Sequence, residues 1–253
     1  MSNDSSKPAA AKHVPWNIPA GVGYAIVVFF TTQIIAGLLV AIIPAARHQN
    51  VSWWLNTTAG QFAYVLLAEA MTIAAVIAFV RLHKTPLRRI GLGKMKVTDP
   101  LIAVPAYVVY LIAFLIGVVL IERFVPSIDV NQTQEIGFAD VHGTMAYVLT
   151  FVSLVILPPI AEEILMRGLI FTSLRKHLKW TSAALITSAL FASAHLPEGG
   201  AAGPLYIAAV DTFLLSLMLC YLREKTGRLY AGITVHMLKN LVAFISLFVL
   251  VAR

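Results

Sequence analysis

Two adjacent carboxylates and an arginine interrupt an apolar stretch of this sequence, within the segment Leu157–Gly168. No Asp, Glu, Lys or Arg occurs in the stretch 141–161 that leads up to Glu162 and Glu163. A charged group is costly at membrane depth, where it usually belongs to a functional site. A carboxylate held there can accept a proton from water during hydrolysis, so this pair is the first candidate for chemistry.

The spacing of the three charges predicts different roles for them. Successive helical side chains point about 100° apart, so Glu162 and Glu163 cannot face the same spot. Glu163 and Arg167 are four residues apart and share a face, which predicts a neutralising ion pair. Glu162 is then free to act, and Pro158 and Pro159 before it weaken the helix and favour a cavity. The alternative is a helix end at the membrane surface.

A histidine closes the next apolar run, in the segment Phe191–His195. The two runs should form an antiparallel hairpin that turns near residues 177–180. Glu162 and His195 each lie about 16 residues from the centre of that turn, so an equal rise per residue predicts the same depth. A lone histidine at the end of a span is more often packed or interfacial than catalytic. His195 is therefore a catalytic candidate because its predicted depth matches that of Glu162.

The last apolar run carries His236 and Asn240, which are four residues apart and project from one helix face. Such a face can offer two hydrogen-bond donors to one oxygen. It can also offer two metal ligands, although asparagine is a poor ligand for zinc. The alternative is that both residues hydrogen-bond neighbouring helices.

Composition predicts the fold that must position these groups. Of 253 residues, 59% are hydrophobic and 12% are charged, whereas a soluble domain carries about 25% charged residues. We therefore expect an all-α, polytopic transmembrane helix bundle of about seven spans, with the active site between the last four helices. The expected spans are Gly21–Ile43, Gly60–Val80, Leu101–Ile121, Met145 to about Ser173, Thr181–His195, Pro204–Leu222 and Leu229–Val251.

The domain organisation follows from these spans. Residues 1–20 should be a flexible cytoplasmic tail, and residues 21–253 the transmembrane domain, with the motifs in 145–248. The fifth span is short as an apolar run, so its boundary is the least defined. Cys220 is the only cysteine, which excludes an intrachain disulfide and a thiolate zinc cluster.

Loop charges predict the orientation in the membrane. With alternating spans, 15 of the 19 basic residues fall on one side, whereas Arg47, Arg123 and Arg253 fall on the other and Lys239 lies within a span. The third loop is acidic, with Glu135 and Asp140 among its residues. The positive-inside rule then places the N-terminus in the cytoplasm and the C-terminus outside. The net charge of +7 reflects this topology and attraction to anionic membrane lipids, not nucleic acid.

Three other charges lie within spans. Asp211 and Lys239 are nearly equidistant from the turn near residues 225–227, which predicts a buried pair. Glu69 has no obvious partner in the second span and is expected to line the cavity or to stay protonated. We expect all three to be structural rather than catalytic.

In their order, the motifs Glu162-Glu163-x-x-x-Arg167, Phe191-x-x-x-His195 and His236-x-x-x-Asn240 resemble those of the CPBP family. This family contains the CAAX prenyl endopeptidases and the bacteriocin-processing (ABI) intramembrane proteases. The resemblance covers roughly residues 145–248, including the Thr226-Gly227 lead-in to the last motif.

The resemblance implies a glutamic intramembrane endopeptidase without a cofactor. Glu162 would activate water beside His195, and His236 and Asn240 would stabilise the oxyanion, with Glu163 and Arg167 in support. The implied partner is a peptide or lipidated protein substrate, prenylated or otherwise, and the implied location is the bacterial cytoplasmic (inner) membrane.

Three alternatives remain at this point. A zinc metalloprotease could use Glu162, His195 and His236 as ligands. A non-catalytic scaffold or bacteriocin-immunity protein could keep the same motifs. A transporter could use the buried charges as a relay, although they cluster on the last four helices only.

Overall fold

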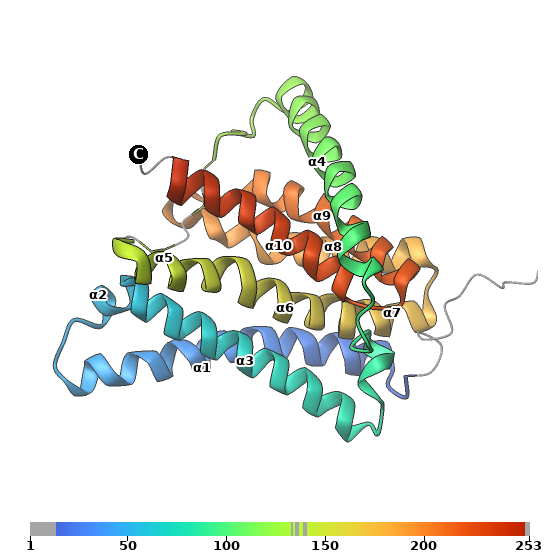
Figure 1. Ribbon diagram of the computed structural model, residues 1–253, viewed down its shortest axis with the longest axis horizontal. Coiled ribbons are helices and arrows are strands. Elements are labelled where there is room, and N and C mark those ends of the chain that lie inside the picture. Colours follow the sequence, from blue (N-terminus) through green and yellow to red (C-terminus); the bar gives the residue numbers. More distant parts are fainter. Residues whose placement is uncertain (1–13, 133, 135–136, 139–140, 251–253) are drawn as a thin grey trace, which may run out of the picture.

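The computed structural model describes residues 14–132, 134, 137–138 and 141–250. These residues form helices and connecting loops, with no strand among them, so the expected all-α bundle is confirmed (Figure 1). Most of the expected tail (residues 1–13), Glu135, Asp140 and Arg253 lie outside the described residues. The α-helices are α1 Tyr24–Ala46, α2 Val51–Asn56, α3 Thr58–Leu82, α4 Thr98–Phe124, α5 Gly143–Phe151, α6 Leu157–Glu163, α7 Thr172–His177, α8 Trp180–Ala194, α9 Tyr206–Thr226 and α10 Tyr230–Phe244.

Six helical segments of the described chain are long and apolar enough to cross a membrane. Each contains or closely overlaps an expected span, and α5 to α7 form one continuous segment through π-helical turns. The expected fifth span, Thr181–His195, is not among these six. That segment forms α8, whose 15 residues fall short of the roughly 20 that a bilayer needs, as its short apolar run predicted. Pro197, Gly199 and Gly200 follow directly, and they stop the helix.

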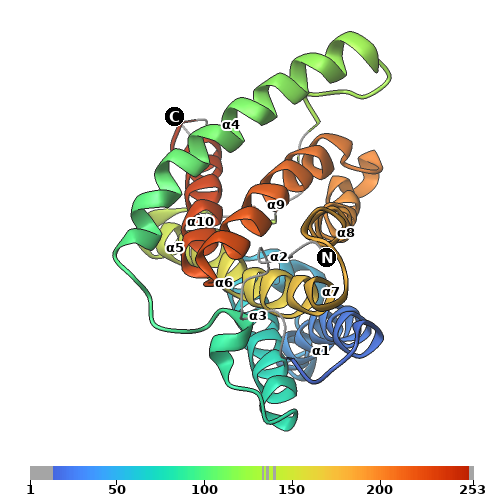
Figure 2. The ribbon, with the colours of Figure 1, turned by 90° about the vertical axis from the view of Figure 1, so that its right-hand side faces the viewer.

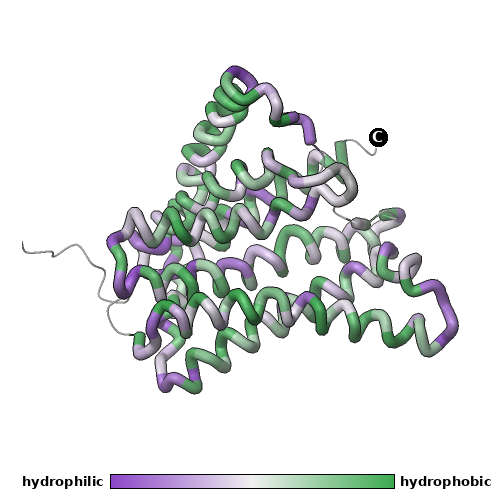
Figure 3. Tube along the Cα trace, turned by 180° about the vertical axis from the view of Figure 1, so that it is seen from behind, coloured by the Kyte–Doolittle hydropathy of each residue, from purple (hydrophilic) through white to green (hydrophobic). Residues whose placement is uncertain are grey.

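The residues of the bundle are mostly apolar along the helices and mostly polar toward the helix ends and loops (Figure 3). Helix α4 is the clearest case, since only 6% of its most apolar 18-residue stretch is buried. Its exposed side chains include Leu101, Val108, Leu115 and Phe124. Figures 1 and 2 show that α4 leans away from the other helices toward its C-terminal end. Such apolar surface requires lipid around it.

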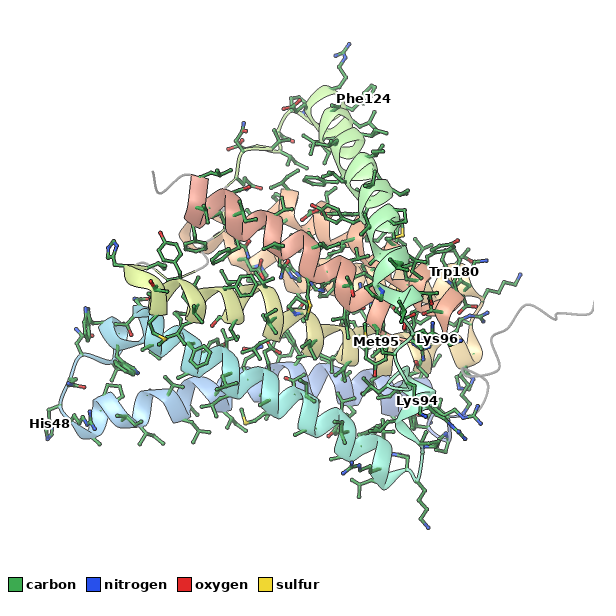
Figure 4. All side chains as sticks on the ribbon, viewed as in Figure 1. His48, Lys94, Met95, Lys96, Phe124 and Trp180 are labelled. Carbon is green, nitrogen blue, oxygen red and sulfur yellow. The ribbon has the colours of Figure 1, made fainter. Side chains whose placement is uncertain are left out.

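The helix ends gather at two ends of the bundle (Figure 4). One end carries Lys94, Lys96 and Trp180, and the other carries His48. We call the first the basic end, because it carries Lys94 and Lys96. This end is formed by the start of α1 and by the loops 83–97, 178–179 and 227–229. The second is the opposite end.

Polar contacts tie the basic end together. Arg228 and the fully buried Asp99 form an ion pair of 2.6 Å, and Arg175 pairs with Glu224 at 2.9 Å. Trp16 is buried, and its indole N–H donates to Ser173 Oγ at 2.8 Å. The last residues of the expected tail therefore belong to the folded bundle.

Candidate active site

The Glu163–Arg167 pair lies in the core, where α6 continues into the π-helix η5 (Ile164–Phe171). Arg167 Nη1 is 2.6 Å from Glu163 Oε1, and both side chains are at most 1% exposed. Arg167 also lies over the ring of Phe191, with its Cζ 4.6 Å from the ring centroid. A Cβ at Gly232 of α10 would stand 3.0 Å from Glu163 Oε2. A glycine at that position therefore lets α10 approach the pair, and the predicted ion pair is confirmed.

Glu162 has a different environment from its neighbour. Its side chain is 25% exposed, against 1% for Glu163, and it lines a cavity. The helix turns the two adjacent carboxylates to different surroundings, as their angular separation predicts. Glu163 is neutralised by Arg167, whereas Glu162 faces open space.

His236 lies between the two carboxylates. Its Nε2 is 3.7 Å from Glu162 Oε2, and its Nδ1 is 3.5 Å from Glu163 Oε1. Both distances exceed an ordinary hydrogen bond, and Nδ1 is buried without a hydrogen-bond partner. The imidazole thus connects the structural carboxylate to the cavity-facing one and needs only a small shift to bond either.

Asn240 extends from the same face of α10 toward the chain before Glu162. Its Nδ2 donates to the Leu154 carbonyl at 2.8 Å. That carbonyl lies in the π-helix η4 (Val152–Ile156), and the donors four and five residues ahead would be Pro158 and Pro159. Neither proline has an N–H, so the carbonyl has no helical donor available. The proline pair therefore creates the acceptor that fixes the Asn240 side chain, with one amide hydrogen left over.

His195 caps α8 beside this group. Its Nδ1 is 2.8 Å from the Phe191 carbonyl, which can only accept, so Nδ1 carries the proton in the neutral ring. Nε2 then has a free lone pair. It lies 3.9 Å from Glu198 Oε1.

Two cavities meet at Glu162, His195 and Glu198. The first, which we call the chamber, has a volume of about 220 Å³. It is lined by the four predicted site residues, which lie on α6, at the C-cap of α8 and on α10. The second, which we call the groove, has a volume of about 550 Å³ and runs beside α1 and α8. The remaining lining of the groove is mostly apolar and includes Ile26, Phe29, Phe30, Leu165, Met166, Ile170 and Leu190.

The chamber also contains groups that the sequence motifs did not single out. Glu198 lies in the 3₁₀ segment η6 (Leu196–Ala202), accepts from Gln134 Nε2 at 2.7 Å and has a pKa raised to about 7 by burial. In the sequence, the only indication of a role for Glu198 is its position three residues after His195. Glu69 of α3 lines the chamber as expected, so the site extends beyond the last four helices. The expected Lys239–Asp211 pair is present at 3.2 Å.

The possible zinc ligands do not form a metal site. Among the described residues, no group of three or more His, Cys, Asp or Glu side chains is arranged to hold a metal ion. Glu162, His195 and His236 line one chamber, and His236 Nε2 lies 3.7 Å from Glu162 Oε2.

A comparison with protein families matches part of the C-terminal half. Residues 144–242 match the family model of the Rce1-like type II CAAX prenyl endopeptidases. A curated relative, an uncharacterized 24.3 kDa protein of Escherichia coli, is 33% identical over 92 residues; the match covers 36% of this chain and 40% of that protein. No solved structure matches the chain. The matched segment begins within α5 and contains all seven residues named in the three motifs.

Proposed function

We propose that this chain, whose residues 144–242 match the Rce1-like family of type II CAAX prenyl endopeptidases, is an intramembrane endopeptidase of the glutamic type. One observation carries the proposal: Glu162, His195, His236 and Asn240, from three helical segments, line one chamber. The helices around that chamber are long and apolar enough for a multi-pass membrane protein.

In the proposed reaction, Glu162 accepts a proton from water as the water oxygen attacks the scissile carbonyl. The free Nε2 of His195 orients that water, and the proton then passes to the leaving amine. The second amide hydrogen of Asn240 and a protonated Nε2 of His236 donate to the developing oxyanion. Glu163 and Arg167 keep the helix in register without contacting the substrate.

The groove supports a substrate that carries a hydrocarbon chain. It reaches Glu162 and His195 from the side of α1 and α8, and its lining is largely apolar. A prenyl or acyl chain there would leave the adjoining peptide in the polar chamber. Burial of such a chain contributes about 0.8 kcal/mol per CH₂, which favours a lipidated peptide over an unmodified one.

The test is cleavage of a quenched fluorescent peptide by protein purified in detergent. The peptide carries an S-farnesyl cysteine followed by three aliphatic residues, with an unfarnesylated peptide as the matched substrate. We expect cleavage of the farnesylated peptide and none by Glu162→Gln. Intact binding with no cleavage by the wild type would instead favour the non-catalytic scaffold.

A second experiment separates the glutamic mechanism from the zinc alternative. Activity is measured before and after extended chelation, with metal content determined by elemental analysis. We expect activity without stoichiometric metal, because Asn240 and the three-helix origin of the other groups suit an oxyanion site better than a zinc site. Stoichiometric zinc, with activity lost on chelation and restored by zinc, would overturn the glutamic mechanism.

We further propose that the basic end faces the cytoplasm of a bacterial inner membrane, as the loop charges predict. Cys220 is the only cysteine and is buried, so single cysteines can be introduced against a silent background. In intact cells, an impermeant maleimide should label Ser127→Cys and not Lys94→Cys. The reverse pattern would contradict this orientation.

A further inference from the structure

A lysine lines the chamber from the helix that also carries the oxyanion residues. Lys239 lies three residues after His236 and directly before Asn240 on α10. Its Nζ is 3.2 Å from Asp211 Oδ2, and Asp211 Oδ1 accepts a hydrogen bond from the Tyr110 hydroxyl. Three helices, α4, α9 and α10, therefore hold this ammonium in one position.

The position of Lys239 relative to the chamber is unusual for a structural pair. Its side chain is 28% exposed, against 13% for Asp211, and only Lys239 of the two lines the chamber. Among the described lining residues it is the one lysine or arginine, whereas Glu69, Glu162 and Glu198 supply three carboxyl groups. In this chamber, an anionic ligand would therefore be attracted by Lys239 and repelled by the surrounding carboxylates.

The ammonium also has hydrogen-bonding capacity that the described contacts do not use. It has three N–H donors, and the described structure gives it one partner, Asp211. Asp211 is itself satisfied by Tyr110 on its other oxygen. A pair needed only to join α9 to α10 would not require an open path from the ammonium to the catalytic groups.

We propose that Lys239 is a specificity-determining residue that binds a carboxylate of the substrate on the leaving-group side of the scissile bond. This inference rests on the proposed endopeptidase function. Lys239 is displaced from His236 by about 4.5 Å along the helix axis. An extended peptide advances about 3.3 Å per residue, so the carboxylate would belong to one of the first few residues after the cleaved bond. Its source is either the chain terminus or an acidic side chain.

The experiment compares four forms of the farnesylated peptide: the free acid, its carboxamide, and carboxamides with Glu or Gln two residues after the cysteine. The measured quantity is the ratio of kcat/KM between each charged form and its neutral partner. A charge-assisted hydrogen bond corresponds to roughly a 10- to 100-fold preference. The wild type should prefer the acid over the carboxamide by that factor if the terminus is the source, or Glu over Gln if a side chain is.

Variants then assign the preference to Lys239. Lys239→Met should bring the ratio close to one, and Lys239→Arg should restore much of it. Asp211→Asn removes the competing carboxylate and should raise the ratio above the wild-type value. A purely structural pair would instead change stability in both variants while leaving every ratio unchanged, and that result would overturn the proposal.

A binding measurement separates failure of this inference from failure of the proposed function. Calorimetry compares a tripeptide acid with its amide on Glu162→Gln and on Glu162→Gln/Lys239→Met. Tighter binding of the acid that disappears in the double variant supports the carboxylate site even where no peptide is cleaved. Cleavage without discrimination, or equal binding of acid and amide, rejects the site and leaves the endopeptidase proposal intact.

Discussion

The basic end and the chamber use the same residue types in opposite ways. At the basic end, Asp99 and Glu224 each meet an arginine at hydrogen-bonding distance. In the chamber, Glu162 approaches the His236 imidazole only to 3.7 Å, and the described contacts give Glu69 no hydrogen bond or ion pair. The basic end pairs these two carboxylates closely, whereas the chamber leaves Glu162 and Glu69 without a close partner among the described residues.

The difference shows where stability and chemistry are separated in this fold. A satisfied buried pair is costly to break, because the remaining charge stays desolvated. A group that must bind water or substrate needs unfilled hydrogen-bonding capacity, which lowers stability locally. The adjacent residues Glu163 and Glu162 illustrate both cases. Glu163 is a paired carboxylate in the core, whereas Glu162 is a carboxylate in the chamber with no close partner in the described part of the chain.

The largest expected effects come from this adjacent pair. Glu162→Gln should lower kcat by at least the roughly 10²–10⁴-fold attributed to a general base, with thermal unfolding in detergent nearly unchanged. Glu163→Gln should lower the free energy of unfolding by about 3–5 kcal/mol, because it leaves Arg167 buried without its counter-charge. Equal loss of stability in the two variants, or full activity of Glu162→Gln, would erase the distinction between them.

Asn240→Ala should have a smaller effect, on both kcat and stability. Removal of an oxyanion donor costs about 10²–10³ in kcat, and the Leu154 carbonyl would lose its partner at about 1–3 kcal/mol of stability. Asn240→Asp is the matched control, because it keeps the size of the side chain but cannot donate when ionised. If stability falls while kcat is retained, Asn240 serves only to hold the helices together.

Asp99→Asn should affect stability alone. It weakens the charge-assisted hydrogen bonds to Arg228 and should cost about 1.5–3 kcal/mol, measured by unfolding in mixed detergent micelles. Asp129→Asn, at an exposed site, is the control and should change stability by less than about 0.5 kcal/mol. Activity per folded molecule should remain at the wild-type value, and a fall in kcat would show that the basic end and the chamber are coupled.

Trp16→Phe should give the smallest effect of the series. The ring still packs against Phe79, but the hydrogen bond to Ser173 is lost. The expected cost is about 0.5–1.5 kcal/mol in the same unfolding assay. A change below the error of measurement would mean that the N-terminal segment contributes little to the basic end.

Several features of the site follow from the sequence through helical geometry alone. The spacing of Glu163 and Arg167 requires a shared face, and the angle between neighbours separates Glu162 from Glu163. The same spacing puts His236 and Asn240 on one side of α10. Local periodicity and apolar length also determined the long helices, because a bilayer allows few other solutions for such segments.

Other features depended on how separate helices meet. The sequence marked Pro158 and Pro159 as helix-weakening, but only the packing of α10 supplies the Asn240 amide to the carbonyl they leave free. The short α8, ended by Pro197 and the glycines after it, brings Glu198 to the chamber, and α3 brings Glu69 from outside the recognised motifs. Sequence spacing fixes which side chains share a helix face, because that relation is local. Only the tertiary structure decided which helix faces enclose a common chamber. That relation depends on interhelical packing and on side chains that are distant in sequence.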